Sequence, residues 1–135
     1  MKYFLPQRLI SSFLSHAVNN FSSVDSRHHE TLAFVIGKQE GEELTATEII
    51  YPLQIGKSDR VEDEGIEHWN LFHQRQLLDD KTVIISWVHS HVRGNPCFFS
   101  SLDMHCQYAY EDQYPGILGT VFEITEENNC NKLFF

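Results

Sequence analysis

The sequence predicts one mixed α/β domain, in which about three helices pack against a single curved β-sheet. At 135 residues the chain is long enough for one domain with its own core. Hydrophobic residues make up 41% of the chain and aromatic residues 13%, which is typical of a packed globular protein. Helix-like and strand-like segments alternate without a linker or an internal repeat, so we expect residues 1–135 to form a single domain.

Three segments have the patterns of helices. Apolar residues recur at intervals of three and four over 9–21, the stripe of an amphipathic helix. A less regular pattern of the same kind covers 66–78. The third helix follows Ser100 or Ser101, either of which can cap it, and ends before Pro115.

Short apolar or β-branched runs between these helices predict the strands of the sheet. The first two runs are close enough in the chain to form a hairpin, and the third is apolar on both faces, which places it in the centre of the sheet. The chain from 54 to 65 is polar and predicts a surface loop, and 126–129 predicts a turn. The predicted strands are 31–37, 43–51, 82–88, 117–124 and 132–135.

Charge and composition exclude several classes of function. The formal net charge is −9, with 10 Lys and Arg against 19 Asp and Glu, which argues against a nucleic-acid partner. We find no apolar segment long enough to span a bilayer and no signal peptide, so we expect an intracellular protein without membrane insertion. Three cysteines without regular spacing indicate free thiols rather than a disulfide scaffold.

The segment after the predicted central strand carries the chemistry of a metal site. Residues two apart at the end of a strand project to the same side, so His89 and His91 can face one metal ion. Ser100 and Asp103 are three apart at the start of a helix and therefore share a face. Two imidazoles and a carboxylate predict a zinc site whose fourth position is open to water.

A hydrolase with such a site also needs a base for the attacking water, and Glu30 is the candidate. It directly precedes the first predicted strand, so a position beside the central strand would bring its carboxylate to the sheet edge that holds His89. Each residue also has a structural interpretation. Ser100 can be only a helix cap, Asp103 can serve only the helix dipole, and Glu30 can be a solvated residue at a strand end.

Together these residues resemble the JAMM (MPN+) metalloprotease family. The resemblance rests on Glu30-Thr31 before an apolar strand, on Ser86 to His91, and on Ser100 to Asp103. It implies an MPN-type domain that removes ubiquitin or a ubiquitin-like protein from lysine. His89, His91 and Asp103 would match the zinc ligands, Glu30 the general base, and Ser100 the hydroxyl that stabilises the oxyanion.

Within the family the chain is most similar to the AMSH-type endosomal deubiquitinases. Trp87, the run from Phe99 to Asp103, and His105 match that branch. The resemblance implies that the 58–65 loop and the helix carrying Trp69 and Phe72 take the place of an insertion that holds the distal ubiquitin; alternatively, those two aromatic residues pack in the core. The branch also carries a structural zinc, but His105 is the one match to its ligands, so we expect one zinc per chain.

The loop between His91 and Ser100 departs from the family pattern. Val92 replaces the usual proline, the loop is one residue longer, and Cys97 lies inside it, either as a buried filler or as a thiol that reaches the zinc.

The resulting prediction is a zinc-dependent deubiquitinase that hydrolyses isopeptide bonds in polyubiquitin, using zinc-bound water activated by Glu30 and an oxyanion stabilised by Ser100. Ubiquitin or polyubiquitin is the expected partner, together with a recruiting protein that the sequence does not identify. The expected location is the cytoplasm, in association with endosomes, or the nucleus. The alternatives are a non-catalytic MPN-type scaffold that binds ubiquitin, or a protease of the same family that acts on another ubiquitin-like protein.

Overall fold

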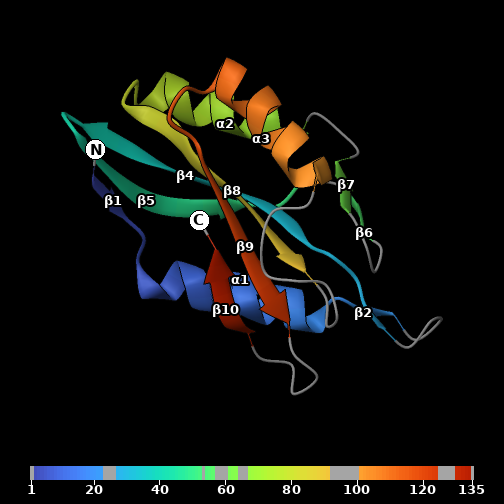
Figure 1. The fold of residues 1–135 in the computed structure, drawn as a ribbon. Helices are drawn as coiled ribbons and strands as arrows, with labels where there is room; N and C mark the ends of the chain where they lie inside the picture. The colour runs from blue at the N-terminus through green and yellow to red at the C-terminus, as the bar shows by residue number, and fades with distance from the viewer. Residues whose placement is uncertain are drawn as a thin grey trace.

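The computed structural model describes residues 2–22, 27–52, 54–56, 61–63, 67–91, 101–124 and 130–134. Figure 1 shows the order of the elements within these ranges. The helices are α1 (Gln7–Asn19), α2 (Glu67–Leu78) and α3 (Ser101–Gln113). The strands are β1 (Lys2–Phe4), β2 (Phe21–Ser22), β3 (Arg27–His28), β4 (Leu32–Glu40), β5 (Glu43–Ile50), β6 (Gln54–Gly56), β7 (Val61–Asp63), β8 (Thr82–His91), β9 (Leu118–Ile124) and β10 (Cys130–Phe134).

A mixed sheet of six strands, in the order β1-β5-β4-β8-β9-β10, is the centre of the described fold. Strand β4 pairs antiparallel with both β5 and β8, whereas β8 pairs parallel with β9. A parallel pair needs a crossover connection, and α3 lies in the connection between β8 and β9. The sequence prediction of an α+β domain with three helices on one mixed sheet is confirmed.

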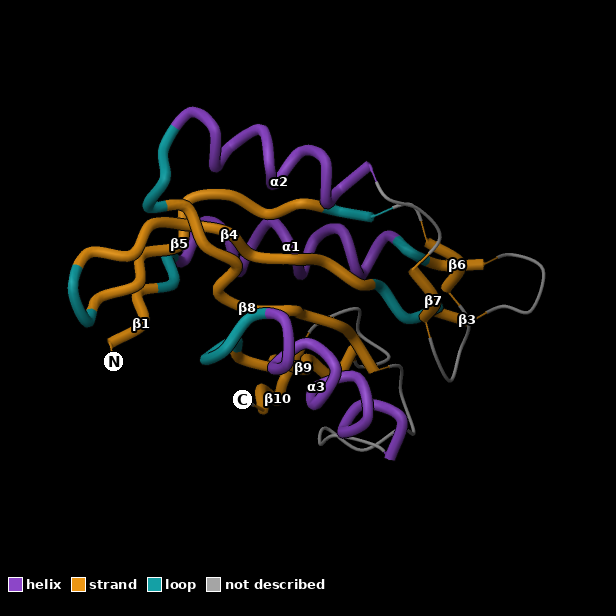
Figure 2. The backbone as a smooth tube through the Cα atoms, turned by 90° about the horizontal axis from the view of Figure 1, so that it is seen from above, coloured by secondary structure: helices purple, strands orange, loops and turns teal. Residues whose placement is uncertain are grey.

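The helices cover the two faces of this sheet. Figures 1 and 2 show α1 on one face and α2 with α3 on the other. Alternate residues of β4 supply the two cores, because successive side chains of a strand point to opposite faces. Ala33 and Val35 belong to the cluster under α1, whereas Phe34 and Ile36 belong to the cluster under α2 and α3.

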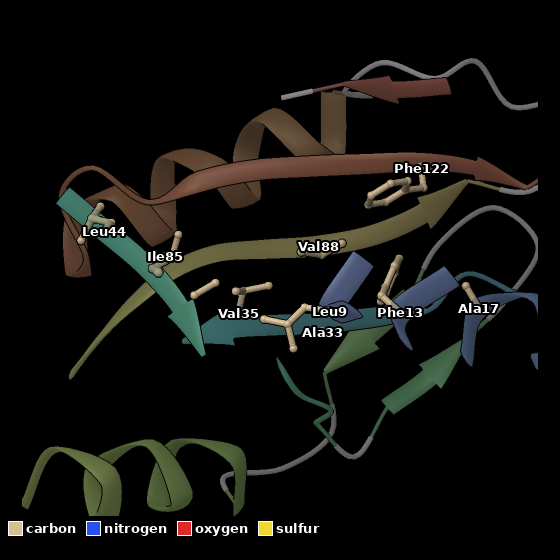
Figure 3. Packing of buried hydrophobic residues seen from close by; sticks show 10 residues of the cluster. Leu9, Phe13, Ala17, Ala33, Val35, Leu44, Ile85, Val88 and Phe122 are labelled. Carbon is tan, nitrogen blue, oxygen red and sulfur yellow. The ribbon is translucent and has the colours of Figure 1, made fainter. Parts of the chain in front are cut away.

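The amphipathic stripe of α1 forms the first core. Leu9, Phe13 and Ala17 are spaced by four residues and are all buried. Figure 3 shows them directed at the sheet, where Phe122 lies with its ring centroid 5.6 Å from that of Phe13. Burying a side chain such as Phe13 contributes about 1.5–3 kcal/mol. Helix α1 is thus fixed to the sheet along its length, including its C-terminal turn.

The boundaries of this helix differ from those expected over 9–21. It begins at Gln7, because the carbonyl of Pro6 already accepts hydrogen bonds from the backbone N–H groups of Leu9 at 3.0 Å and Ile10 at 3.4 Å. It ends at Asn19, because Phe21 pairs with His28 in the β2–β3 hairpin.

Two strand predictions need correction. The loop expected over 54–65 contains a short hairpin, in which β6 pairs antiparallel with β7. The central strand continues to His91 rather than ending at 88, because β9 pairs with it as far as His91. The turn expected at 126–129 lies outside the described residues, and the last strand is found at Cys130–Phe134.

Gly37 occupies a position where two strands approach closely. It follows a register shift in the pairing of β4 with β5. A Cβ atom at Gly37 would lie 2.0 Å from the backbone oxygen of Thr45 and 2.7 Å from Cδ1 of Ile85. Because the first of these atoms belongs to the backbone, no side-chain rotation can make room for it.

We therefore expect Gly37→Ala to lower the free energy of unfolding by about 1–3 kcal/mol, the usual range for overpacking a core. Urea denaturation followed by circular dichroism measures the change. Gly41→Asn is the control, because a Cβ atom there meets nothing within 4 Å and asparagine tolerates the φ of 62°. Equal midpoints for Gly37→Ala and the parent would contradict the close approach.

Candidate metal centre

The end of β8 places two imidazoles on one side of the sheet. His89 and His91 are two apart on this strand and both are buried. Their Nε2 atoms lie 3.0 Å from each other. Ser90, between them, points the other way and accepts a hydrogen bond at 2.9 Å from the backbone N–H of Thr31. The alternation of the strand thus gives the pair one common face, as the sequence predicted.

Helix α3 supplies a carboxylate to the same point. Asp103 is the third residue of the helix and is 8% exposed. Its Oδ1 atom lies 3.2 Å from Nε2 of His89, and its Oδ2 atom lies 3.1 Å from Nε2 of His91. The carboxylate therefore contacts both imidazoles.

Glu30 approaches the histidines from the segment that leads into β4. Leu32 is the register partner of His89, so the residues just before Leu32 lie beside the end of β8. Glu30 is 3% exposed. One of its carboxylate oxygens, a ring nitrogen of His89 and a ring nitrogen of His91 all lie within 4.8 Å of one another. This arrangement confirms that Glu30 and His89 are neighbours at one sheet edge. It does not support a solvated Glu30.

Burial controls the protonation of His89. Desolvation lowers the pKa of this imidazole, and the neighbouring Asp103 carboxylate opposes that effect. The ring is 1% exposed, so the cost of burying a cation favours its neutral form. A neutral imidazole has the lone pair that a metal ion requires.

The spacing of the three groups fits a tetrahedral metal ion. Ligands bound to zinc at about 2.0–2.1 Å in tetrahedral geometry lie about 3.3 Å from one another. The Nε2 atoms of His89 and His91 lie 3.0 Å apart, close to this spacing, and Asp103 approaches them with different oxygens, Oδ1 at 3.2 Å from His89 and Oδ2 at 3.1 Å from His91. Two nitrogens and a carboxylate also form a chemically suitable donor set for zinc. The residues present therefore fit the ion that the sequence predicted.

A second layer of contacts holds the His89 ring. Trp87 lies parallel to it, with an interplanar angle of 3° and a centroid distance of 4.7 Å. The indole N–H of Trp87 donates a hydrogen bond to Oε1 of Gln107. Gln107 in turn donates from Nε2 to the backbone oxygen of Ile117 at 3.0 Å and to Glu111 at 2.9 Å. Helix α3 therefore supplies both Asp103 and the residue that fixes the support of His89.

Gln107 was not among the candidate residues, although the sequence contains a usable indication. It is four residues after Asp103 and therefore lies on the same face of α3. A polar residue on that face, next to an aromatic residue of the central strand, suggests a buried hydrogen bond.

Four further residues singled out in the sequence lie either outside the described residues or in the core. Ser100 and Cys97, with the loop 92–100 that contains them, lie outside the described residues. Phe72 is 2% exposed and packs in the core under α2, and Trp69 packs against that core. The core interpretation of these two aromatic residues is supported.

Comparison with known proteins agrees with this site. A family model described as JAB1/Mov34/MPN/PAD-1 ubiquitin protease matches residues 2–116. The match covers most of the chain, including Glu30, His89, His91 and Asp103, and the fold is the α+β domain expected from the sequence. The chain therefore belongs to the JAB1/Mov34/MPN/PAD-1 family.

Curated relatives are of the AMSH type. The chain is 27% identical over 130 residues to AMSH-like ubiquitin thioesterase 3 of Arabidopsis thaliana, covering 96% of this chain and 24% of that protein. It is 30% identical over 118 residues to the human AMSH-like protease, covering 87% and 25%. A STAM-binding protein-like sequence of Xenopus laevis is 29% identical over 117 residues, covering 87% and 26%. The chain thus spans about a quarter of the length of these relatives.

Within the described ranges, none of the helices combines the length and the apolar character needed to cross a membrane.

The Trp87–Gln107 contact predicts a measurable contribution to stability. Gln107→Ala would leave the buried indole N–H without its acceptor and the Ile117 carbonyl without its donor. Each loss typically costs about 1–3 kcal/mol, so we expect thermal and urea denaturation to show a decrease in that range. Tyr108→Ala is the control, because this neighbouring side chain is 61% exposed and should change stability by less than about 0.5 kcal/mol. Equal effects of the two variants would contradict a structural role for Gln107.

Proposed function

We propose that this chain is the catalytic domain of a zinc-dependent deubiquitinase that hydrolyses isopeptide bonds in polyubiquitin. The observation that carries the proposal is that Glu30, from the segment before β4, and Asp103, from α3, both approach the buried pair His89 and His91 on β8. Membership of the family and the printed names of the relatives, ubiquitin thioesterase and AMSH-like protease, favour ubiquitin as the substrate.

We assign residues 1–135 to this one domain. The family match ends at 116, but β9 lies beyond it and pairs with β8 inside the main sheet. The strand that carries the histidines thus needs a neighbour from outside the matched range.

His89, His91 and Asp103 would hold one zinc ion. When bound, zinc acts as a Lewis acid that polarises the substrate carbonyl and promotes ionisation of water near neutral pH. The lowered pKa of His89 keeps this ligand neutral, and Trp87 together with Gln107 fixes the plane of its ring.

Glu30 would act as the general base and then as the general acid. Its carboxylate takes a proton from the water that attacks the isopeptide carbon. The same proton then passes to the lysine nitrogen as the C–N bond breaks, giving a carboxylic acid and an amine, which become carboxylate and ammonium by transfer of the second proton. Burial of Glu30 next to the histidines suits this role, since little solvent competes for the proton. Ser100 would donate a hydrogen bond to the oxyanion, as the family resemblance implies.

Strand β7 of the β6–β7 hairpin lies within the 58–65 segment, which by the family resemblance would contact the distal ubiquitin. Gln54 at its start donates from Nε2 to the Leu32 carbonyl at 2.9 Å and accepts from the Leu32 N–H at 2.7 Å. The hairpin is thereby attached next to the segment that carries Glu30. The STAM-binding names of some relatives suggest a STAM-type recruiting partner, and the resemblance to AMSH-type endosomal deubiquitinases suggests an endosomal location; the proposal includes both.

Measurements of zinc binding distinguish the proposed ligand Asp103 from the proposed general base Glu30. We expect the parent protein to bind one zinc ion per chain by mass spectrometry of the metal. A ligand present at about a thousand times its dissociation constant stabilises the folded state by about 4 kcal/mol, so zinc should raise the melting temperature of the chelator-treated protein. Asp103→Asn should lose most of this increase, whereas Glu30→Gln should keep it.

Asp112→Asn is the matched control for zinc binding, because it changes an exposed aspartate in the same helix. If Glu30→Gln lost zinc while Asp103→Asn kept it, the roles of the two carboxylates would be exchanged.

Catalysis provides the direct test of the proposed function. Glu30→Gln should lower kcat for diubiquitin cleavage by about 10²–10⁴-fold, the usual contribution of a general base, while zinc stays bound. Glu42→Gln, at an exposed turn, is the control and should cleave like the parent. A gel assay with diubiquitins of defined linkage measures the rates and reports which linkage is cut.

A parent protein that binds zinc and ubiquitin but cleaves none of the diubiquitins would instead indicate the non-catalytic scaffold. Cleavage of a conjugate of a different ubiquitin-like protein would indicate the second alternative, a protease of the same family that acts on that protein.

A further inference from the structure

Glu30 needs a support that the sheet itself does not provide. It lies two residues before β4, and residues 29–31 are not part of a strand. A general base has to stay within about 2.6–3.2 Å of the proton that it takes. The position of its backbone therefore depends on contacts other than the β4 ladder.

The side chain of Asn20 makes such contacts on both sides of Glu30. Its Nδ2 atom donates to the backbone oxygens of His29 at 3.1 Å and Glu30 at 3.3 Å, and to Oγ1 of Thr31 at 2.7 Å. The backbone oxygen of Asn20 also accepts from the N–H of His29 at 2.9 Å. Since backbone carbonyls can only accept, the amide nitrogen must be the atom that faces them. One amide thus holds three consecutive residues, with the candidate base in the middle.

The same segment is tied to the strand that carries the histidines. Thr31 donates its N–H to Oγ of Ser90 at 2.9 Å, and its carbonyl accepts from the N–H of Ser90 at 3.0 Å. Ser90 is 0% exposed and lies between His89 and His91. A continuous chain of hydrogen bonds therefore runs from Asn20 through Thr31 to the middle of the histidine pair.

The backbone of Asn20 is itself anchored to the end of α1. It follows the last turn of α1, and its N–H donates to the carbonyl of Ala17 at 3.2 Å. Ala17 is 0% exposed and belongs to the core between α1 and the sheet, where Figure 3 shows it at the end of the helix. Packing of α1 is thereby transmitted to the backbone of Glu30.

We propose that Asn20 is a positioning residue for the general base, acting on the backbone of Glu30 from the opposite face of the sheet. This inference rests on the proposed function, in which Glu30 moves the proton during isopeptide hydrolysis. Within the described residues, Asn20 makes no hydrogen bond to His89, His91 or Asp103. Its effect should therefore fall on kcat, with little change in KM or in bound zinc.

Asn20→Ala tests this role. Removal of the amide lets the 29–31 segment shift, and a misplacement of about 1 Å at a catalytic group can cost about 100-fold in rate. We expect kcat for diubiquitin cleavage to fall by at least about tenfold, with KM within about twofold of the parent and one zinc per chain. The control is Asn19→Ala, which removes the adjacent exposed amide and should leave kcat unchanged.

A crystal structure of the zinc-loaded Asn20→Ala protein gives a readout that does not depend on activity. We expect the Glu30 carboxylate to be displaced from its parent position while His89, His91 and Asp103 stay in place. Should Asn20→Ala fail to fold, Asn20→Ser serves instead, because its hydroxyl supplies one donor and should give a smaller loss of kcat.

Chemical rescue separates the missing amide from a general loss of structure. A cavity of about 490 Å³ borders Asn20 and Thr31 and gives small molecules access to the position of the removed amide. Acetamide should therefore raise kcat of Asn20→Ala several-fold and leave Glu30→Gln inactive. A merely structural role for Asn20 would not produce rescue of this kind.

The outcomes separate this inference from the proposed function. Unchanged kcat in Asn20→Ala, or an undisplaced Glu30 in its crystal structure, overturns the positioning role even if the parent is an efficient deubiquitinase. A parent that cleaves no diubiquitin overturns the proposed function; a displaced Glu30 in the variant would then still establish that Asn20 positions this carboxylate.

Discussion

The antiparallel pairing of β4 with β8 is the contact on which the rest of the candidate site depends. Its register sets Leu32 opposite His89 and so brings the segment before β4 next to the histidines. A shift of one residue would turn every side chain of one strand to the other face. The two histidines would then point toward α1, away from Asp103. The difference between the two faces of β8 holds the register, because a slip of one residue would move the polar His89 and His91 into the apolar core under α1.

The same alternation divides the molecule into a supporting side and a candidate metal side. Under α1 a cluster of buried hydrophobic residues fixes the helix to the sheet (Figure 3). On the other face, Trp87 and His89 lie parallel above the strand and α3 supplies Asp103 and Gln107. The contacts of Asp103 with the two histidines, and of Gln107 with Trp87, offset part of the cost of burying these polar groups.

Hydrogen bonds from both faces meet at the strand ends. Gln107 acts from α3 on the residue stacked against His89, whereas Asn20 acts from the end of α1 on the segment around Glu30. Ser90 connects the two sides, since it lies between the histidines and bonds to Thr31. A buried polar network of this kind resists displacement as long as its donors and acceptors are matched. This explains how residues far apart in the chain can define one small volume.

The sequence by itself determined the kinds of elements and the chemistry available to them, because helix and strand periods and the His-x-His spacing are local properties. It also indicated Glu30, His89, His91 and Asp103 as candidates. The strand patterns missed β1, the β2–β3 hairpin, the two short strands within 54–65 and the extension of β8 to His91. Those features depend on pairing with distant partners, as do the contacts of Asn20 and Gln107. Only the tertiary structure decided which groups meet, because the register of β4 on β8 and the crossover through α3 are set by long-range packing.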